Sequence, residues 1–182
     1  MHSELVKNWF GDKFSELHPL LQKLHTEGGK LTGEVNIHYG KGIAGIVGKR
    51  LAKKMNLPEE GVHQLKVDIS HTNGCLHWGR CFNNQARVVS LFKPVGNISK
   101  GYWIETTGPL TMKLTVDIFE GGWYWRCLKI NLLGLPIPLF LMPKTKAFKT
   151  VENGQYRFSV QFLLPVFGSL VSYHGLLQAE YN

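Results

Sequence analysis

The chain is poor in cysteine and in acidic residues, and it contains no long hydrophobic run. It has three cysteines among 182 residues, an odd number without the spacing of a disulfide scaffold, which predicts reduced thiols and a cytoplasmic protein. Residues 1–14 carry charges and no continuous apolar core, so they are not typical of a signal peptide. The longest apolar run, 132–142, is shorter than the ~18 residues of a membrane-spanning helix.

Several motifs that carry chemistry are also missing. No Gly-x-Gly-x-x-Gly is present for a dinucleotide, and no Gly-x-Ser-x-Gly or catalytic-cysteine signature surrounds the serines and cysteines. The tight spacings of zinc sites are absent around His71, Cys75, His77 and Cys81. Aromatic and basic residues interleave at 101–103 and 121–126 without a recognised nucleic-acid motif. We therefore expect no cofactor, no metal and no nucleic-acid partner.

Basic residues are in excess. The 21 Lys+Arg and 13 Asp+Glu give a formal net charge of +8. Such a charge favours an anionic partner, although solubility alone explains it equally well.

Many of the basic residues fall on a predicted helix over 42–56. Its larger apolar residues share one face, namely Ile43, Ile46, Val47, Leu51 and Met55. Basic residues crowd the remainder, among them Lys49, Arg50, Lys53 and Lys54. Two interpretations stay open. The helix either covers a barrel with its outer face in solvent, or it makes weak contact with an anionic membrane surface.

The rest of the chain is typical of short helices followed by strands. Residues 1–28 have apolar residues at helical spacing, and the break at His18-Pro19 predicts two short helices. A strand is predicted over 30–39, before the helix. After Gly61, turns at 72–74 and 152–154 and alternating apolar residues predict strands over 65–70, 76–82, 86–92, 102–106, 110–119, 123–132, 155–164 and 170–179.

This order predicts a mainly β protein with some helix (α+β), folded as one domain over 1–182. An antiparallel β-barrel or strongly curved sheet, similar to lipocalins or fatty-acid-binding proteins, protects the edges of so many sequential strands. The helical segment 1–28 precedes the barrel segment 30–182, which holds the helix 42–56 between its first two strands. The alternative is a helix-grip fold, which requires a long carboxy-terminal helix, and 170–181 is not typical of one.

Short motifs along nearly the whole chain resemble a bacterial family, the domain of unknown function 4166. The motifs are Leu17-His18-Pro19 with Leu24-His25, Trp78-x-Arg80-x-Phe82, Glu105 with Gly108-Pro109, Gly134 to Pro138, and Leu170-Val171-x-Tyr173-x-Gly175. The chain departs from the family's usual arginine at Lys144 and from its common acidic residue at Phe148-Lys149. The resemblance implies a fold and no reaction.

Two arginines, Arg80 and Arg126, lie where the strand alternation predicts an apolar face inside the barrel. A buried guanidinium needs an anion. One hypothesis is that a ligand carboxylate or phosphate supplies it, with further contacts from Trp78, Tyr124, Tyr173 and His174. The other hypothesis is an internal ion pair with Glu34, Glu105 or Asp117.

The predicted function is therefore non-catalytic binding of an apolar or amphipathic anionic small molecule in the barrel cavity. The alternative is an enzyme, or an accessory domain to redox chemistry, whose candidate catalytic residues are Glu105, Tyr173 and His174.

Overall fold

The computed structural model describes residues 4–85, 87–108, 110–138, 144–164 and 168–181. The helices are α1 (Leu5–Phe10), the 3-10 helix η1 (Gly11–Glu16), α2 (Pro19–Glu27) and α3 (Gly42–Lys54). The strands are β1 (Gly29–Tyr39), β2 (Gly61–Thr72), β3 (Cys75–Phe82), β4 (Val88–Val95), β5 (Tyr102–Thr107), β6 (Leu110–Phe119), β7 (Gly122–Leu132), β8 (Leu135–Ile137), β9 (Lys144–Glu152), β10 (Gln155–Leu164) and β11 (Gly168–Glu180).

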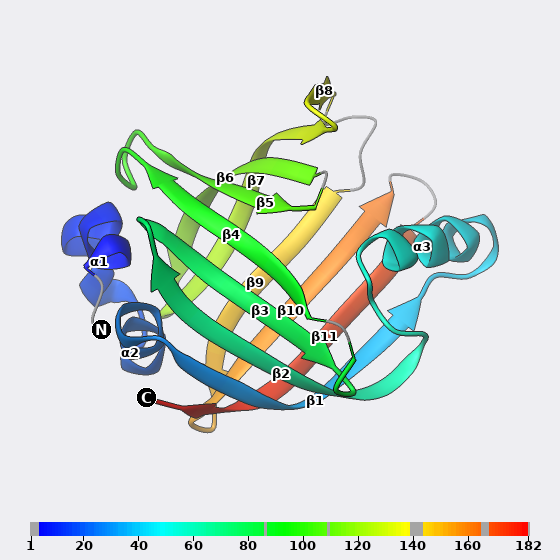
Figure 1. Cartoon of the computed structure of the whole chain (residues 1–182), viewed down its shortest axis with the longest axis horizontal. Coiled ribbons are helices and arrows are strands. Elements are labelled where there is room, and N and C mark those ends of the chain that lie inside the picture. Colours follow the sequence, from blue (N-terminus) through cyan, green and yellow to red (C-terminus); the bar gives the residue numbers. More distant parts are fainter. Residues whose placement is uncertain (1–3, 86, 109, 139–143, 165–167, 182) are drawn as a thin grey trace.

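Within these residues, ten antiparallel strands close into a barrel (Figure 1). Its strand order is β6-β5-β4-β3-β2-β1-β11-β10-β9-β7, and β7 pairs back with β6 to complete the ring. The short strand β8 pairs with the carboxy-terminal end of β7. The predicted antiparallel barrel, with amino-terminal helices and a helix between its first two strands, is confirmed.

Asn-Gly turns set the register of two hairpins. Asn73 and Gly74, between β2 and β3, have φ angles of 52° and 70°, and Asn153 and Gly154, between β9 and β10, have 50° and 75°. Two successive positive φ angles match the right-handed twist of the flanking strands, and asparagine followed by glycine adopts them at the lowest cost. Both turns lie where the sequence predicts them.

Most predicted elements are confirmed, with two strands missed, the short β8 and the longer β9. The break at His18-Pro19 lies where α2 begins, and His18 Nδ1 caps this helix by accepting from the backbone N–H of Leu20 at 3.1 Å. The chain end forms β11, which excludes the helix-grip alternative. β9 was not predicted, because its apolar Phe148 faces outward and its charged Lys149 faces inward, the reverse of the usual pattern. Ala86, Pro109, 139–143 and 165–167, on which parts of the predicted elements and motifs fall, lie outside the described residues.

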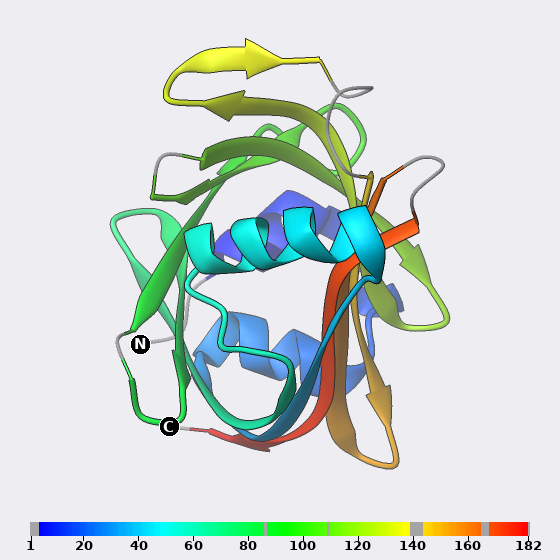
Figure 2. The same cartoon turned by 90° about the vertical axis from the view of Figure 1, so that its right-hand side faces the viewer.

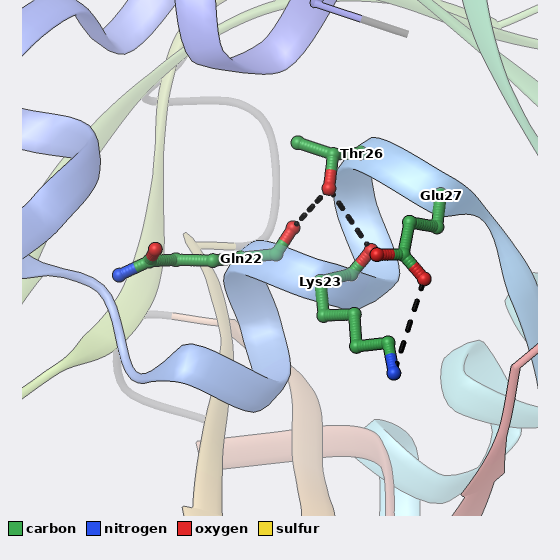
Figure 3. A network of polar contacts seen from close by, with 4 residues as sticks. All are labelled: Gln22, Lys23, Thr26 and Glu27. Carbon is green, nitrogen blue, oxygen red and sulfur yellow. Dashed lines mark hydrogen bonds and ion pairs between the residues drawn. The ribbon is translucent and has the colours of Figure 1, made fainter. Parts of the chain in front are cut away.

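The outer side of α2 carries a polar network that is local to the helix (Figure 3). Thr26 Oγ1 donates to the carbonyl oxygens of Gln22 and Lys23, at 3.0 and 3.2 Å, and Lys23 Nζ lies 4.0 Å from Glu27 Oε2. Such exposed contacts contribute little to stability. They leave the apolar side of α2, with Leu21 and Leu24, free to pack into the barrel.

The two ends of the barrel are covered differently. Helices α1 and α2 close one end, and α3 crosses the other, as the view in Figure 2 shows. At the α1 end, Trp9, Phe10, Trp103 and Trp123 are at most 2% exposed and their rings contact one another. We call these four residues the aromatic plug.

Helix α3 packs on the barrel with its smallest residues. Its buried residues are Ala44, Gly45, Gly48 and Ala52, and only the flank with Leu51 and Met55 adds partly buried larger side chains. The predicted apolar face is therefore not the packed one, because Ile43, Ile46 and Val47 point into solvent.

Candidate functional site

The barrel interior holds a group of polar side chains from six different elements. We name it the interior cluster; it consists of His25, Arg80, Ser90, Glu105, Lys149 and Tyr173. Strand alternation points the five strand residues of this set inward, from β3, β4, β5, β9 and β11, while α2 inserts His25 from the closed end. Buried polar groups of this number in one core call for a functional or structural reason.

Lys149 and His25 form a fully buried pair. His25 Nδ1 lies 2.7 Å from the carbonyl oxygen of Leu21. A carbonyl only accepts, so Nδ1 carries the proton and Nε2 of the neutral ring is an acceptor. Lys149 Nζ, 2.6 Å away, donates to this Nε2. The pair links α2 to β9 through the middle of the barrel.

Three indole rings surround the ammonium group of Lys149. Its Nζ lies 3.7 Å from the ring centroid of Trp123, 4.6 Å from that of Trp78 and 5.5 Å from that of Trp125. Contacts with the faces of indole rings stabilise a cation. Burial acts against the charge and lowers the pKa of Lys149 well below its ordinary value, while the negative charge of Glu105 opposes this shift.

His25 is held neutral by the same environment. Burial lowers the pKa of His25 well below its ordinary value, the charge of Lys149 lowers it further, and the hydrogen bond to Leu21 opposes the shift. Its ring stacks on Trp123 with centroids 4.8 Å apart. A neutral His25 is the state that accepts from Lys149, so the hydrogen-bond geometry and the pKa direction agree.

Arg80 reaches a chain of hydroxyl groups. Its Nη2 donates to Ser90 Oγ at 2.5 Å, Ser90 and Thr107 hydroxyls lie 2.6 Å apart, and Thr107 Oγ1 donates to Glu105 Oε1 at 3.4 Å. Arg80 Nε is enclosed and has no hydrogen-bond partner among the described residues. Within the same residues, no carboxylate lies within 4.0 Å of the Arg80 guanidinium.

The carboxyl group of Glu105 and the phenol of Tyr173 complete the cluster. Burial raises the pKa of Glu105, against the opposing effects of the Arg80 charge and of the Ser90 and Thr107 hydroxyls. Burial also raises the pKa of Tyr173, which the Arg80 charge opposes. Both shifts favour neutral groups that can donate a hydrogen bond as well as accept one.

The inward side chains are less buried towards the α3 end than around the aromatic plug. Inward side chains there remain half-buried although the barrel encloses them, namely Trp78, Arg80, Glu105, Met112, Trp125, Phe158, Val160 and Phe162. Two shallow hollows lie elsewhere on the surface, one on the outer wall of β1, β10 and β11 and one between α1, η1 and α2, and no residue of the interior cluster lines either of them.

Three of the six predicted ligand-binding residues lie in the interior: Trp78, Arg80 and Tyr173. The other three lie on the outer wall: Tyr124, Arg126 and His174. The prediction that these three face the barrel interior is wrong. Tyr124 stacks on Phe148 with ring centroids 5.4 Å apart, and His174 stacks on His38 at 5.9 Å. Arg126 Nε donates to Asp117 Oδ2 at 3.0 Å, and both side chains are more than half exposed.

Local backbone geometry explains these errors. The pairing of β6 with β7 shifts between Lys113 and Leu114, opposite Cys127 and Lys129. The extra residue of this bulge reverses the phase of the alternation, so Ile130 faces inward while Arg126 faces outward. His174 follows the buried Tyr173 directly in β11, and neighbouring residues of a strand point to opposite faces.

Lys149 and His25 were missed as site residues. The available signals were the Leu24-His25 motif and the departure from the family pattern at Phe148-Lys149. In β9, Phe148 points outward and Lys149 points inward. A rule that assigns apolar residues to the core therefore predicts the wrong face for both. Among the described residues, no group of three or more His, Cys, Asp or Glu side chains is placed to hold a metal ion.

The fold and the cluster define a small antiparallel β-barrel protein with a charged, tryptophan-lined interior. The chain belongs to the family described as Domain of unknown function (DUF4166), whose pattern matches residues 17–177. Comparison with curated proteins and with solved structures gave no match. In the part of the chain that the structure describes, no helix has the length and apolarity to cross a membrane.

Proposed function

We propose that the barrel binds an amphipathic small molecule whose anionic head group contacts Arg80. The observation that carries this proposal is that Arg80 donates to hydroxyl groups but has no ion-pair partner: its Nε is enclosed without an acceptor, and no carboxylate lies within 4.0 Å among the described residues. A half-buried cation without a counter-ion carries part of the cost of desolvation, and an anionic ligand offsets that cost.

Glu105 does not replace such a ligand. Its carboxyl group interacts with the hydroxyl groups of Ser90 and Thr107, and it acts on Arg80 through charge alone. Burial raises its pKa and thus favours the neutral acid. The charge of Arg80 acts against this shift, but no carboxylate oxygen of Glu105 lies within 4.0 Å of the guanidinium, so Arg80 has no direct ion-pair partner among the described residues.

The surroundings of Arg80 suit an amphiphile. Tyr173 supplies a buried hydroxyl beside the guanidinium. The half-buried wall formed by Trp125, Phe158 and Phe162 offers apolar surface to a hydrocarbon tail. Small-molecule sites in proteins commonly combine such an apolar lining with a few placed polar groups.

The experiment compares two arginine variants with a fluorescent fatty acid and the matching fatty alcohol as probes. Arg80→Met should weaken binding of the carboxylate at least about tenfold, since a hydrogen bond to a charged group contributes ~1.5–3 kcal/mol. Binding of the alcohol should change little. Arg126→Met is the matched control, because Arg126 lies on the outer wall and its loss should leave both affinities unchanged.

Two outcomes contradict the proposal. One is a wild-type protein that binds neither probe. The other is a folded Arg80→Met variant, checked by circular dichroism, that binds the carboxylate as tightly as the wild type does.

A second candidate function is an enzyme that uses Glu105 for proton transfer. The observation that favours it is the interaction of Glu105 with Lys149, two groups whose pKa values burial shifts towards each other. His174, a further catalytic candidate, lies on the opposite face of the wall. Incubation with carboxylated metabolites, followed by NMR, distinguishes the two: turnover that Glu105→Gln abolishes supports the enzyme, and unaltered bound ligand supports carriage.

A further inference from the structure

We infer that the outer side of α3 is a docking face for an anionic lipid membrane. The docking face consists of Ile43, Ile46 and Val47 in the first half of the helix and of Lys49, Arg50, Lys53 and Lys54 in the second half. All seven residues are exposed on the side of α3 away from the barrel. The inference does not depend on what the barrel interior binds.

The orientation of α3 is the reverse of that of an ordinary surface helix. Such a helix buries its branched apolar residues and exposes its small or polar ones. In α3 the side chains of Ile43, Ile46 and Val47 are 65%, 57% and 37% exposed, while the alanines and glycines of the other side are buried. Three neighbouring aliphatic side chains on one exposed face mark an interaction surface.

Close backbone contact fixes this orientation. A Cβ atom at Gly48 would overlap the carbonyl group of Leu170, and one at Gly45 would overlap the carbonyl of Gly40. The inner side of α3 therefore has no room for isoleucine or valine, and the helix cannot rotate to bury them. In Figure 2, α3 lies across the mouth of the barrel with its outer side towards the viewer.

The charge of the docking face selects the partner. Helix α3 contains no acidic residue. Among the described residues, no carboxylate lies within 4.0 Å of its lysines or of Arg50. Four uncompensated cations beside three aliphatic side chains match the interface of an anionic bilayer, where head groups meet the cations and acyl chains meet the aliphatic residues.

Nucleic acid fits this face less well. Phosphates would satisfy the cations, but base stacking needs aromatic side chains, and the docking face has none. Ile43 and Ile46 would stay in water in such a complex.

The test is co-sedimentation of the full chain with vesicles of phosphatidylcholine alone or mixed equally with phosphatidylglycerol. The wild type should bind the mixed vesicles, more weakly at high salt, and should bind the neutral vesicles at least about tenfold less. The combined variant K49E/R50E/K53E/K54E should lose at least about tenfold in binding to mixed vesicles. Its matched control, K30E/K93E/K100E/K129E, changes the net charge equally at exposed positions away from α3 and should keep most of the binding.

The apolar part of the face has its own variant. Ile43→Ser with Ile46→Ser should reduce binding to mixed vesicles several-fold without a change in net charge. Val62→Ser with Phe119→Ser is the control, since Val62 and Phe119 are 60% and 61% exposed on other elements.

Several results would overturn the inference. Wild-type protein that fails to bind mixed vesicles contradicts it, and so do helix variants that bind as their controls do. Loss of binding in the charge variant alone, with the serine variant unaffected, indicates adsorption by charge without insertion of the aliphatic residues. Binding to duplex DNA that depends on the four cations, together with no vesicle binding, assigns the face to nucleic acid instead.

Discussion

The two ends of the barrel are covered by different kinds of side chain. Strand β10 passes through both regions and shows the contrast. Tyr156, near the α1 and α2 end, is 1% exposed, whereas Phe158, Val160 and Phe162, further towards α3, are half-buried. Large aromatic residues fill the first end, and a helix with an alanine and glycine face covers the second.

The two ends are therefore expected to contribute unequally to the stability of the barrel. A packed aromatic plug excludes water and ligands alike, so it holds the barrel closed and cannot open without loss of core contacts. A helix attached by small residues buries little apolar surface. If the barrel binds a ligand as proposed, the α3 end is where we expect it to enter.

The largest expected effect comes from the packed end. Trp123→Ala removes a fully buried ring that contacts Phe10, His25 and Lys149. Such a change should lower the free energy of unfolding by about 3–5 kcal/mol, as measured by urea denaturation. Phe162→Ala, at the other end, removes a half-buried ring and should cost less than half as much. Equal losses for the two variants would contradict the division of the barrel into a packed and an open end.

A smaller effect is expected at the contact between α3 and the barrel. Gly48→Leu places a side chain where the carbonyl of Leu170 lies, so α3 must shift outward. Overpacking of this kind costs about 1–3 kcal/mol, which urea denaturation measures. Faster amide exchange confined to α3 should accompany it.

The control for this change is Ile46→Leu on the outer side of the same helix. Ile46 is 57% exposed, so its replacement should change stability by less than about 0.5 kcal/mol. A Gly48→Leu variant as stable as this control, with unchanged exchange in α3, would show that α3 is not held by close backbone contact.

The sequence was sufficient to predict the barrel, but only three of the six predicted ligand-binding residues lie in its interior. Asn-Gly turns and regular alternation are local signals, and they located the hairpins and the inward positions of Trp78 and Arg80. The bulge at Leu128 of β7 is set by the pairing of β7 with β6, so alternation within β7 alone misplaced Arg126. Lys149 can lie on the inner face of β9 because Trp78, Trp123, Trp125 and His25 accommodate its amine. These residues are distant in sequence, so they leave no local pattern around position 149.

The smallest expected effect concerns Lys149, whose burial should make the free energy of unfolding depend on pH. Burial lowers the pKa of Lys149 in the folded chain, with Glu105 opposing the shift. Between that lowered pKa and the ordinary lysine pKa of ~10.4, the unfolded chain binds a proton that the folded chain does not. Stability should therefore rise with pH through this window and be lost as pH falls, by at most about 1.4 kcal/mol per pH unit.

Urea denaturation of the wild type and of Lys149→Met between about pH 8 and pH 9.5 tests this dependence. His25 contributes only below its ordinary pKa, and the buried Tyr156 and Tyr173 contribute only above about pH 10, where the unfolded chain releases phenol protons first. Burial raises the pKa of Cys127, so this thiol adds a downward slope above its ordinary pKa of ~8.5, and this slope is the same in the wild type and the variant. The variant should lose the upward slope and should be at least as stable as the wild type at the lower pH, because methionine removes the cost of a buried amine. Lys146→Met, on the exposed side of β9, should keep the wild-type slope. If the slope survives in Lys149→Met, the amine is solvated in the folded chain, and the interior next to the aromatic plug is as open as the α3 end.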